Sequence, residues 1–101
     1  MIARLWHGRT RLSDADEYAT FMKDRAAPDY SSVDGLKKLY FLRREDDDAA
    51  HFLLVTLWDS MESVKKFAGE QPGNARYYPE DDTFLLEKEA TSAHYEVFFE
   101  I

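Results

Sequence analysis

The stretch HFLLVTLWDSMESVKKFA, residues 51 to 68, determines how the rest of the chain must fold. From Phe52 to Trp58 every residue except Thr56 is apolar, which predicts a strand that is hydrophobic on both faces. After this strand the apolar residues take up helical spacing, at Met61, Val64, Phe67 and Ala68. A strand buried on both faces needs two covers, and a short chain provides helices for only one. We therefore expect a second copy of the protein to cover the other face.

The composition is that of one folded domain covering residues 1–101. The chain is 45% hydrophobic and 15% aromatic, with only four glycines and three prolines. The absence of cysteine excludes disulfides, thiolate chemistry and cysteine-based zinc sites. The net charge of −7 argues against nucleic-acid partners and against binding to anionic membranes. Because we find neither a signal peptide nor an apolar run of the roughly 20 residues that a membrane span needs, we expect a cytoplasmic protein.

Hydrophobic periodicity predicts the order strand, helix, strand, strand, helix, strand. The expected elements include strands at 2–11, 36–59 (a hairpin of two strands) and 94–101, and a short helix opening at 79–82. The first long helix is expected to begin after an N-cap at Ser13 and to be stopped by Pro28. The second is expected to follow Ser60 and to end at Ala68, with Gly69 as its C-terminal cap.

Two strand–helix–strand units of this kind predict an α+β, ferredoxin-like fold, in which a four-stranded antiparallel sheet carries its helices on one face. The opposite face keeps the apolar side chains of the hairpin, whose first strand is an exposed edge. Both surfaces are covered when two sheets pack face to face. We therefore expect a homodimer with the form of a dimeric α/β barrel.

The three histidines are candidates for proton transfer or ligand binding. His94 opens the last strand, next to the first strand that carries Trp6, where it could act as a base or hold a ligand in an apolar pocket. The alternative is a hydrogen-bonded histidine at a strand end. His51 is expected to be solvated beside the hairpin turn, and His7 to be partly buried beside Leu5. Their separation in sequence gives no metal-ligand spacing, so no metal is expected.

Aromatic residues supply the other ligand-binding candidates. Tyr77 lies in the irregular segment 70–78, which could cover a cleft between helices and sheet. Its hydroxyl could donate to a ligand or face solvent while the ring packs. Trp6 could contact a ligand or belong to the core, and Trp58 is expected in the core or an interface.

Two charged features are interpreted as structural. Arg4 is expected to pair across the sheet with Glu96 or Glu100. The acidic run from Glu45 to Asp48 is expected to be a solvated turn, because it lacks the alternating spacing and the glycine of a calcium loop.

Four stretches together resemble a known family: IARLWHGRT, VTLWDSMESVKKFAG, ARYYPEDDTFLLE and HYEVFFE. They are similar to the antibiotic biosynthesis monooxygenase (ABM) domain of the dimeric α/β-barrel superfamily, in register over nearly the whole chain. The resemblance implies a homodimer with a ligand cleft between helices and sheet in each subunit. Characterised members include cofactor-independent monooxygenases of polyketide anthrones, quinol monooxygenases and haem-degrading enzymes.

The family's functional residues transfer only in part. Haem-degrading members have an asparagine on the first strand, a tryptophan on the second helix and a histidine just beyond it. This chain has Leu5 or Trp6, then Phe67, then Tyr77. Because none of the three matches, the resemblance does not imply haem degradation. Anthrone-oxidising members use asparagine, tryptophan and tyrosine, of which Trp6 and Tyr77 are loose counterparts.

The expected function is a cofactor-independent monooxygenase acting on a small aromatic, quinol or anthrone-type substrate. In this hypothesis His94 is the catalytic base and Tyr77 a second catalytic candidate, while Trp6, Phe67 and Tyr77 bind the ring and exclude water. No cofactor is expected. The alternative is a non-catalytic ligand-binding or stress-related homodimer of the same fold. A cleft too small for a bicyclic ligand, or filled by Trp6 and Phe67 themselves, would favour that alternative.

Overall fold

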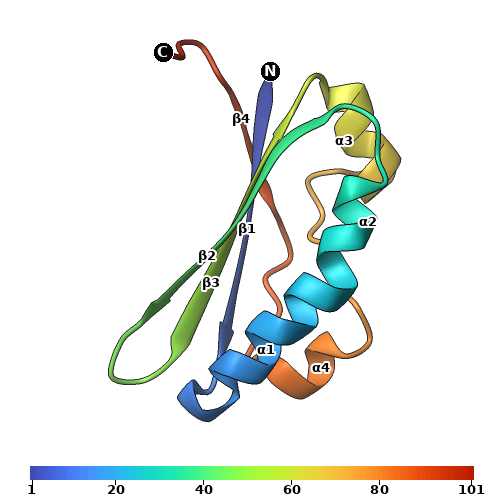
Figure 1. The fold of residues 1–101 in the computed structure, drawn as a ribbon. Helices are drawn as coiled ribbons and strands as arrows, with labels where there is room; N and C mark the ends of the chain where they lie inside the picture. Colours follow the sequence, from blue (N-terminus) through green and yellow to red (C-terminus); the bar gives the residue numbers. More distant parts are fainter.

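The computed structural model describes residues 1–101 as a four-stranded antiparallel sheet with every helix on one side of it, as Figure 1 shows. The strands are β1 (Ile2–Thr10), β2 (Leu36–Glu45), β3 (Ala50–Trp58) and β4 (Ala93–Glu96), in the spatial order β2-β3-β1-β4. The helices are α1 (Ala15–Phe21), α2 (Ala27–Ser31), α3 (Met61–Ala68) and α4 (Asp81–Phe84). The predicted α+β, ferredoxin-like fold is therefore confirmed. None of these helices has both the length and the hydrophobicity of a membrane span.

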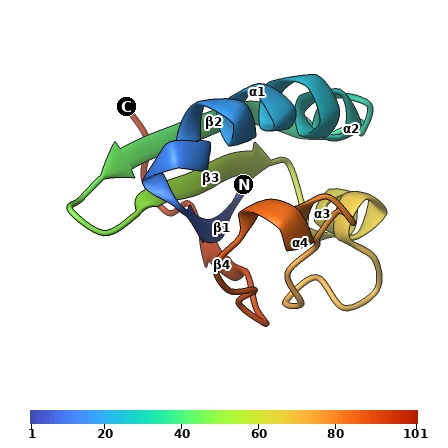
Figure 2. The ribbon, with the colours of Figure 1, turned by 90° about the horizontal axis from the view of Figure 1, so that it is seen from below.

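The central strand β3 behaves as its apolar run predicted. Phe52, Leu54 and Trp58 are buried on the side of the sheet that faces the helices. The alternate residues of β3 are half-exposed on the other side, which no part of the chain covers (Figure 2). Trp58 lies in the core, and its indole N–H donates to the Thr56 hydroxyl over 2.8 Å.

The hairpin turn is exposed, as expected, and one of its acids organises it. The Asp46 carboxylate accepts the backbone N–H groups of Asp48 and Ala49, over 2.9 and 2.8 Å. These two hydrogen bonds, with a third from the His51 side chain, lower the pKa of Asp46 to about 2. The acidic run is thus a capped turn between β2 and β3.

The first long helix differs from the prediction at both ends. Ser13 is not an N-cap but lies inside a 3₁₀ turn, Leu12–Asp14, that precedes α1. Pro28 does not stop the helix, which continues through a π-helical stretch, Met22–Ala26, into α2. In that stretch the Ala27 N–H reaches back to the Met22 carbonyl. Pro28 then stands in the first turn of α2, where a missing N–H does no harm.

The second long helix, α3, has the predicted caps. The Ser60 hydroxyl accepts the Ser63 N–H over 3.2 Å, which satisfies one donor at the N-terminus. Gly69 ends the helix with a φ of 91°, a conformation that favours glycine. A second glycine with positive φ, Gly35, leads into β2 and packs directly against Ser63.

The last strand is half as long as predicted. It ends at Glu96, because Ile2, the first residue of β1, is the partner of Glu96. The Val97 N–H still donates to the Met1 carbonyl over 2.9 Å, and beyond it the described chain gives β4 no neighbour. Phe98, Phe99 and Ile101 are consequently exposed, with Phe98 93% accessible.

Candidate functional site

The cleft between the helices and the sheet is nearly filled by its own side chains. Trp6 and Leu54 form its floor, and Tyr30 and Tyr78 contribute to its walls. The free volume is about 20 Å³, which is room for about one water molecule. The cleft is therefore closed in this structure.

Four residues, on β1, on β4 and directly before β4, contain all the buried side-chain nitrogen and oxygen atoms that lack a hydrogen-bond partner. These atoms are Nε and Nη2 of Arg4, Nε1 of Trp6, Oγ of Ser92 and Nε2 of His94. Arg4 and Trp6 are alternate residues of β1, so they point to the same side of the sheet. His94 is the direct partner of Arg4 in β4, and Ser92 precedes β4 by one residue. We call this group the donor block.

Arg4 is the charged centre of the donor block. Its side chain is only 1% exposed, and burial lowers the pKa of its guanidinium, while the neighbouring Tyr30 hydroxyl opposes that shift. The predicted ion pair with Glu96 or Glu100 is wrong. The register places His94 opposite Arg4, whereas Glu96 is exposed opposite Ile2 and Glu100 lies beyond the strand.

His94 is half-buried, and its ring has no protein partner at Nε2. Burial lowers the pKa of His94, and the Arg4 cation lowers it further. The imidazole is therefore neutral at neutral pH, the form in which a histidine accepts a proton.

Gly8 gives the Trp6 ring its position. A Cβ atom at residue 8 would lie 2.7 Å from Cη2 of Trp6, so the indole lies across the backbone of its own strand. The Tyr77 ring meets Trp6 edge-on, with ring centroids 5.9 Å apart. The Tyr77 hydroxyl donates to the Glu89 carbonyl over 2.5 Å, so it is already engaged.

Phe67 connects α3 to the donor block. Its ring stacks on Tyr30 with centroids 4.1 Å apart, and the Arg4 guanidinium lies 5.8 Å from its centre. The structure thus brings Trp6, Phe67 and His94 around Arg4. Tyr77 packs beside them through its ring.

Arg76 is a cleft residue that sequence reasoning missed. Its guanidinium lies 4.4 Å from the centre of the Phe67 ring and donates to the Phe67 carbonyl over 3.3 Å. It also lies 3.8 Å from the Asp29 carboxylate, which accepts the Tyr78 hydroxyl over 2.7 Å. These contacts hold the irregular segment that follows α3 against α2. That segment has no periodicity, so only the neighbouring tyrosines marked it as a cover for the cleft.

Asp81 is a second residue that the sequence did not single out. It is buried, accepts the Tyr18 hydroxyl over 2.8 Å and the Tyr78 N–H over 2.7 Å, and lines the same cleft. Burial raises the pKa of Asp81, although both hydrogen bonds oppose the shift. Asp81 is thereby a buried acid that fastens α4 and the segment before it to α1.

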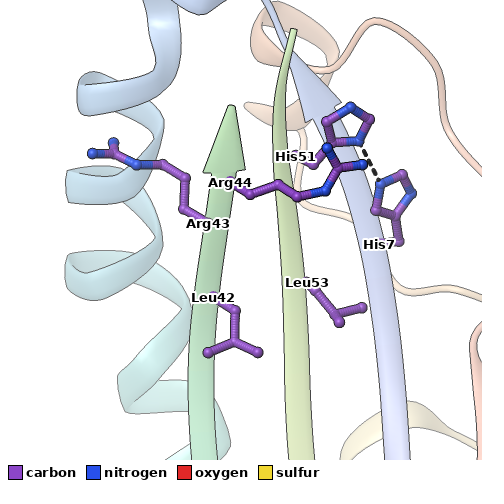
Figure 3. Close-up of a pocket in the computed structure, with 6 residues that line it drawn as sticks. All are labelled: His7, Leu42, Arg43, Arg44, His51 and Leu53. Atoms are coloured by element: carbon purple, nitrogen blue, oxygen red, sulfur yellow. Dashed lines mark hydrogen bonds between the residues drawn. The ribbon is translucent and has the colours of Figure 1, made fainter. Parts of the chain in front are cut away.

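The other two histidines meet on the uncovered side of the sheet. Nε2 of His7 and Nδ1 of His51 are 3.1 Å apart, and the two rings are stacked (Figure 3). His7 also bonds to Glu89, and His51 bonds to Asp46 over 2.9 Å. His51 is therefore hydrogen-bonded rather than freely solvated, whereas His7 is half-buried as expected.

These histidines border a hollow of about 280 Å³. Leu42 and Leu53 form its apolar part, and Arg44 extends toward His51 (Figure 3). Arg43 points instead to the helix side, where it pairs with Asp16 over 3.0 Å. The hollow thus lies on the side of the sheet opposite to the donor block.

Comparison with known proteins finds structural likeness only: no family model and no curated protein matches the chain. A candidate antibiotic biosynthesis monooxygenase from Bacillus cereus superposes with a TM-score of 0.68 at 10% sequence identity, covering 99% of this chain and 95% of that one. The haem-degrader MhuD from Mycobacterium tuberculosis, with two haems in its active site, gives a TM-score of 0.65 at 17% identity, covering 100% and 99%. A mutant of MhuD with two manganese protoporphyrin IX molecules per active site gives 0.63 at 17% identity, covering 100% and 98%. The predicted structural resemblance to ABM proteins is confirmed over the full chain, and at these identities it establishes the fold.

Proposed function

We propose that the protein is a cofactor-independent monooxygenase that oxidises a small, electron-rich aromatic compound such as a quinol or an anthrone. One observation supports this above the others: a neutral histidine with a free ring nitrogen, His94, lies opposite Arg4 in the sheet, on the strand next to the one that carries Trp6. The fold shared with a candidate antibiotic biosynthesis monooxygenase supports the same reaction class.

In this reaction Nε2 of His94 removes a proton from an activated C–H group of the ring system. The resulting carbanion transfers an electron to O₂, and the two radicals combine to form a peroxide. The imidazolium of His94 returns its proton to the peroxide, which then loses water to leave a carbonyl group. For an anthrone, the sum is one CH₂ group and one O₂ converted into one C=O group and one H₂O. Trp6, Phe67 and the Tyr77 ring hold the substrate and keep solvent from the carbanion.

Substrate entry requires the cleft to open, because about 20 Å³ cannot hold an aromatic ring. In this proposal the irregular segment between α3 and α4 moves aside, since its Arg76 and Tyr78 side chains line the cleft and it belongs to no helix or strand. Opening breaks the two contacts of this segment with Asp29, a half-exposed ion pair of Arg76 and a part-buried hydrogen bond of Tyr78. The ion pair contributes little to the free energy that holds the segment in place.

A second copy of the chain completes this proposal. The uncovered side of the sheet carries apolar residues from all four strands: Leu5, Tyr40, Leu42, Leu53, Val55, Leu57 and Tyr95. Phe98 and Phe99, after β4, are large apolar side chains that are exposed as well. A surface of this kind favours burial against its own copy.

Oxygen consumption tests the reaction. We expect at least one compound in a panel of anthrones and quinols to raise the rate of O₂ uptake, and His94→Ala to lower kcat/KM about 10²- to 10⁴-fold. His51→Ala, on the far side of the sheet, is the matched control and should leave the rate unchanged. If no compound is oxidised, or if His94→Ala retains the wild-type rate while folded by circular dichroism, the proposed function is wrong.

The closed cleft favours a second candidate, a non-catalytic ligand-binding or stress-related module of the same fold. Trp6 fills the space that a bicyclic substrate would need, and the Tyr77 hydroxyl is already bonded. Ligand binding without any O₂ uptake, across the same panel, would identify this candidate as the correct one.

A further inference from the structure

We infer that the donor block binds an anionic oxygen, a carboxylate or an ionised phenol, attached to a small aromatic ring. This inference rests on the proposed function and names the ligand class of its site, but its binding test does not depend on turnover. Its basis is the Arg4 side chain, which is 1% exposed and has no partner for two of its donor atoms.

The other arginines show how unusual this arrangement is within the molecule. Each of them is paired with an acid within 4.0 Å: Arg9 with Glu87, Arg11 with Asp14, Arg25 with Glu80, Arg43 with Asp16, Arg44 with Asp46, and Arg76 with Asp29. The chain has 20 acidic residues, and yet none of them pairs with the one arginine that is fully buried. An unpaired buried charge is costly, so such a residue is kept where a ligand supplies the missing charge.

The free donor atoms have the geometry that recognises an oxyanion. Nε and Nη2 of Arg4 form one edge of the guanidinium, which can give two parallel N–H···O bonds to a carboxylate. The Trp6 indole N–H only donates, and the Ser92 hydroxyl can donate as well. A cationic ligand would meet the Arg4 charge and find few acceptors. The donor block is therefore suited to an anion.

The residues around the donor block favour a ligand whose anionic oxygen is attached to a flat, apolar ring. The Phe67 ring lies with its centre 5.8 Å from the Arg4 guanidinium and 4.4 Å from that of Arg76, so aromatic and cationic groups already lie side by side here. Trp6 provides a second aromatic surface. These two aromatic surfaces suit a flat ring, as in a quinol or an anthrone.

Calorimetric titration with three probes tests the inference. Benzoate carries a carboxylate, 4-nitrophenol at about pH 8.5 carries an ionised phenol, and benzamide is the neutral isostere of benzoate. We expect at least one anion to bind wild-type protein ten-fold or more tightly than benzamide. Preference for benzoate alone would identify the ligand as a carboxylate, and preference for 4-nitrophenolate alone as a phenol.

Variants assign the preference to the donor block. Arg4→Met should abolish the difference between anion and benzamide, Arg4→Lys should reduce it by losing the paired donors, and Arg43→Met, a paired surface arginine, should leave it intact. Equal affinity of wild type for all three probes, or a preference that survives in folded Arg4→Met, would overturn the inference. If Arg4→Met does not fold, the affinities of wild-type protein for the two anions and for benzamide test the inference on their own.

The outcomes for binding and for turnover are separable. Anion binding that depends on Arg4, with no oxidation of any quinol or anthrone, would keep this inference and remove the proposed function. Oxidation that persists in Arg4→Met, in a protein whose wild type shows no anion preference, would keep the proposed function and remove this inference.

Discussion

At the scale of single residues, His94 shows how two neighbours set a proton affinity. Burial and the Arg4 cation lower its pKa below the ordinary value of 6.5. The unfolded chain therefore takes up a proton at His94 before the folded protein does. Stability from this residue falls as the pH drops below 6.5, and the loss ends at the lower folded-state pKa.

NMR titration of the His94 ring checks this directly. We expect a midpoint below 6.5 in the wild type. The midpoint in Arg4→Met should be higher, because the Arg4 charge, which lowers the pKa of His94, has been removed. The acid limb of any pH–rate profile should move in the same direction. A midpoint that is the same in both proteins would mean that the Arg4 charge does not reach the imidazole.

At the scale of elements, the junction between β2 and α3 depends on Gly35. Its φ is 99°, and a Cβ atom there would lie 2.2 Å from Oγ of Ser63 and 2.7 Å from Oδ1 of Asp59. Gly35→Ala should lower the free energy of unfolding by about 2–4 kcal/mol, from backbone strain and displacement of the Ser63 side chain. Urea denaturation measures this loss. Gly73→Ala, with open space around its Cβ position, should change stability by less than about 0.5 kcal/mol, and an equal loss in both variants would refute the explanation.

Elements whose signals are local could be predicted from the sequence. The hairpin of β2 and β3 followed its apolar runs and acidic turn, and α3 followed its spacing and its caps, Ser60 and Gly69. Pro28 misled the prediction because a π-helical stretch placed it in a first turn. The end of β4 depends on where β1 begins, which is a pairing between distant parts of the chain.

For the candidate site, the sequence predicted individual residues but not their arrangement in space. Trp6, Phe67 and His94 stood out by residue type, but their arrangement around Arg4 follows from strand register, which no local pattern reveals. The carboxylate expected for Arg4 was assigned from residue type alone, and the register put a histidine there instead.

At the scale of the whole molecule, the bare side of the sheet predicts association. Sedimentation velocity at micromolar concentration should give a particle with twice the 11.8 kDa mass of one chain. Val55→Asp places a charge at the centre of that side, opposite Leu5 and Tyr40, and should give monomers. Lys65→Asp, on the exposed surface of α3, is the control and should leave the mass unchanged. A wild-type particle of 11.8 kDa would refute the association.

The row of Glu89, His7, His51 and Asp46 ties the hairpin turn to the segment before β4. Three hydrogen bonds join these four groups, from Asp46 in the turn through the two rings to Glu89. Side chains from four separate stretches of the chain thus form one continuous polar line along a flank of the largely apolar side of the sheet. Removing either ring would divide this line, because His7 and His51 are its two middle members.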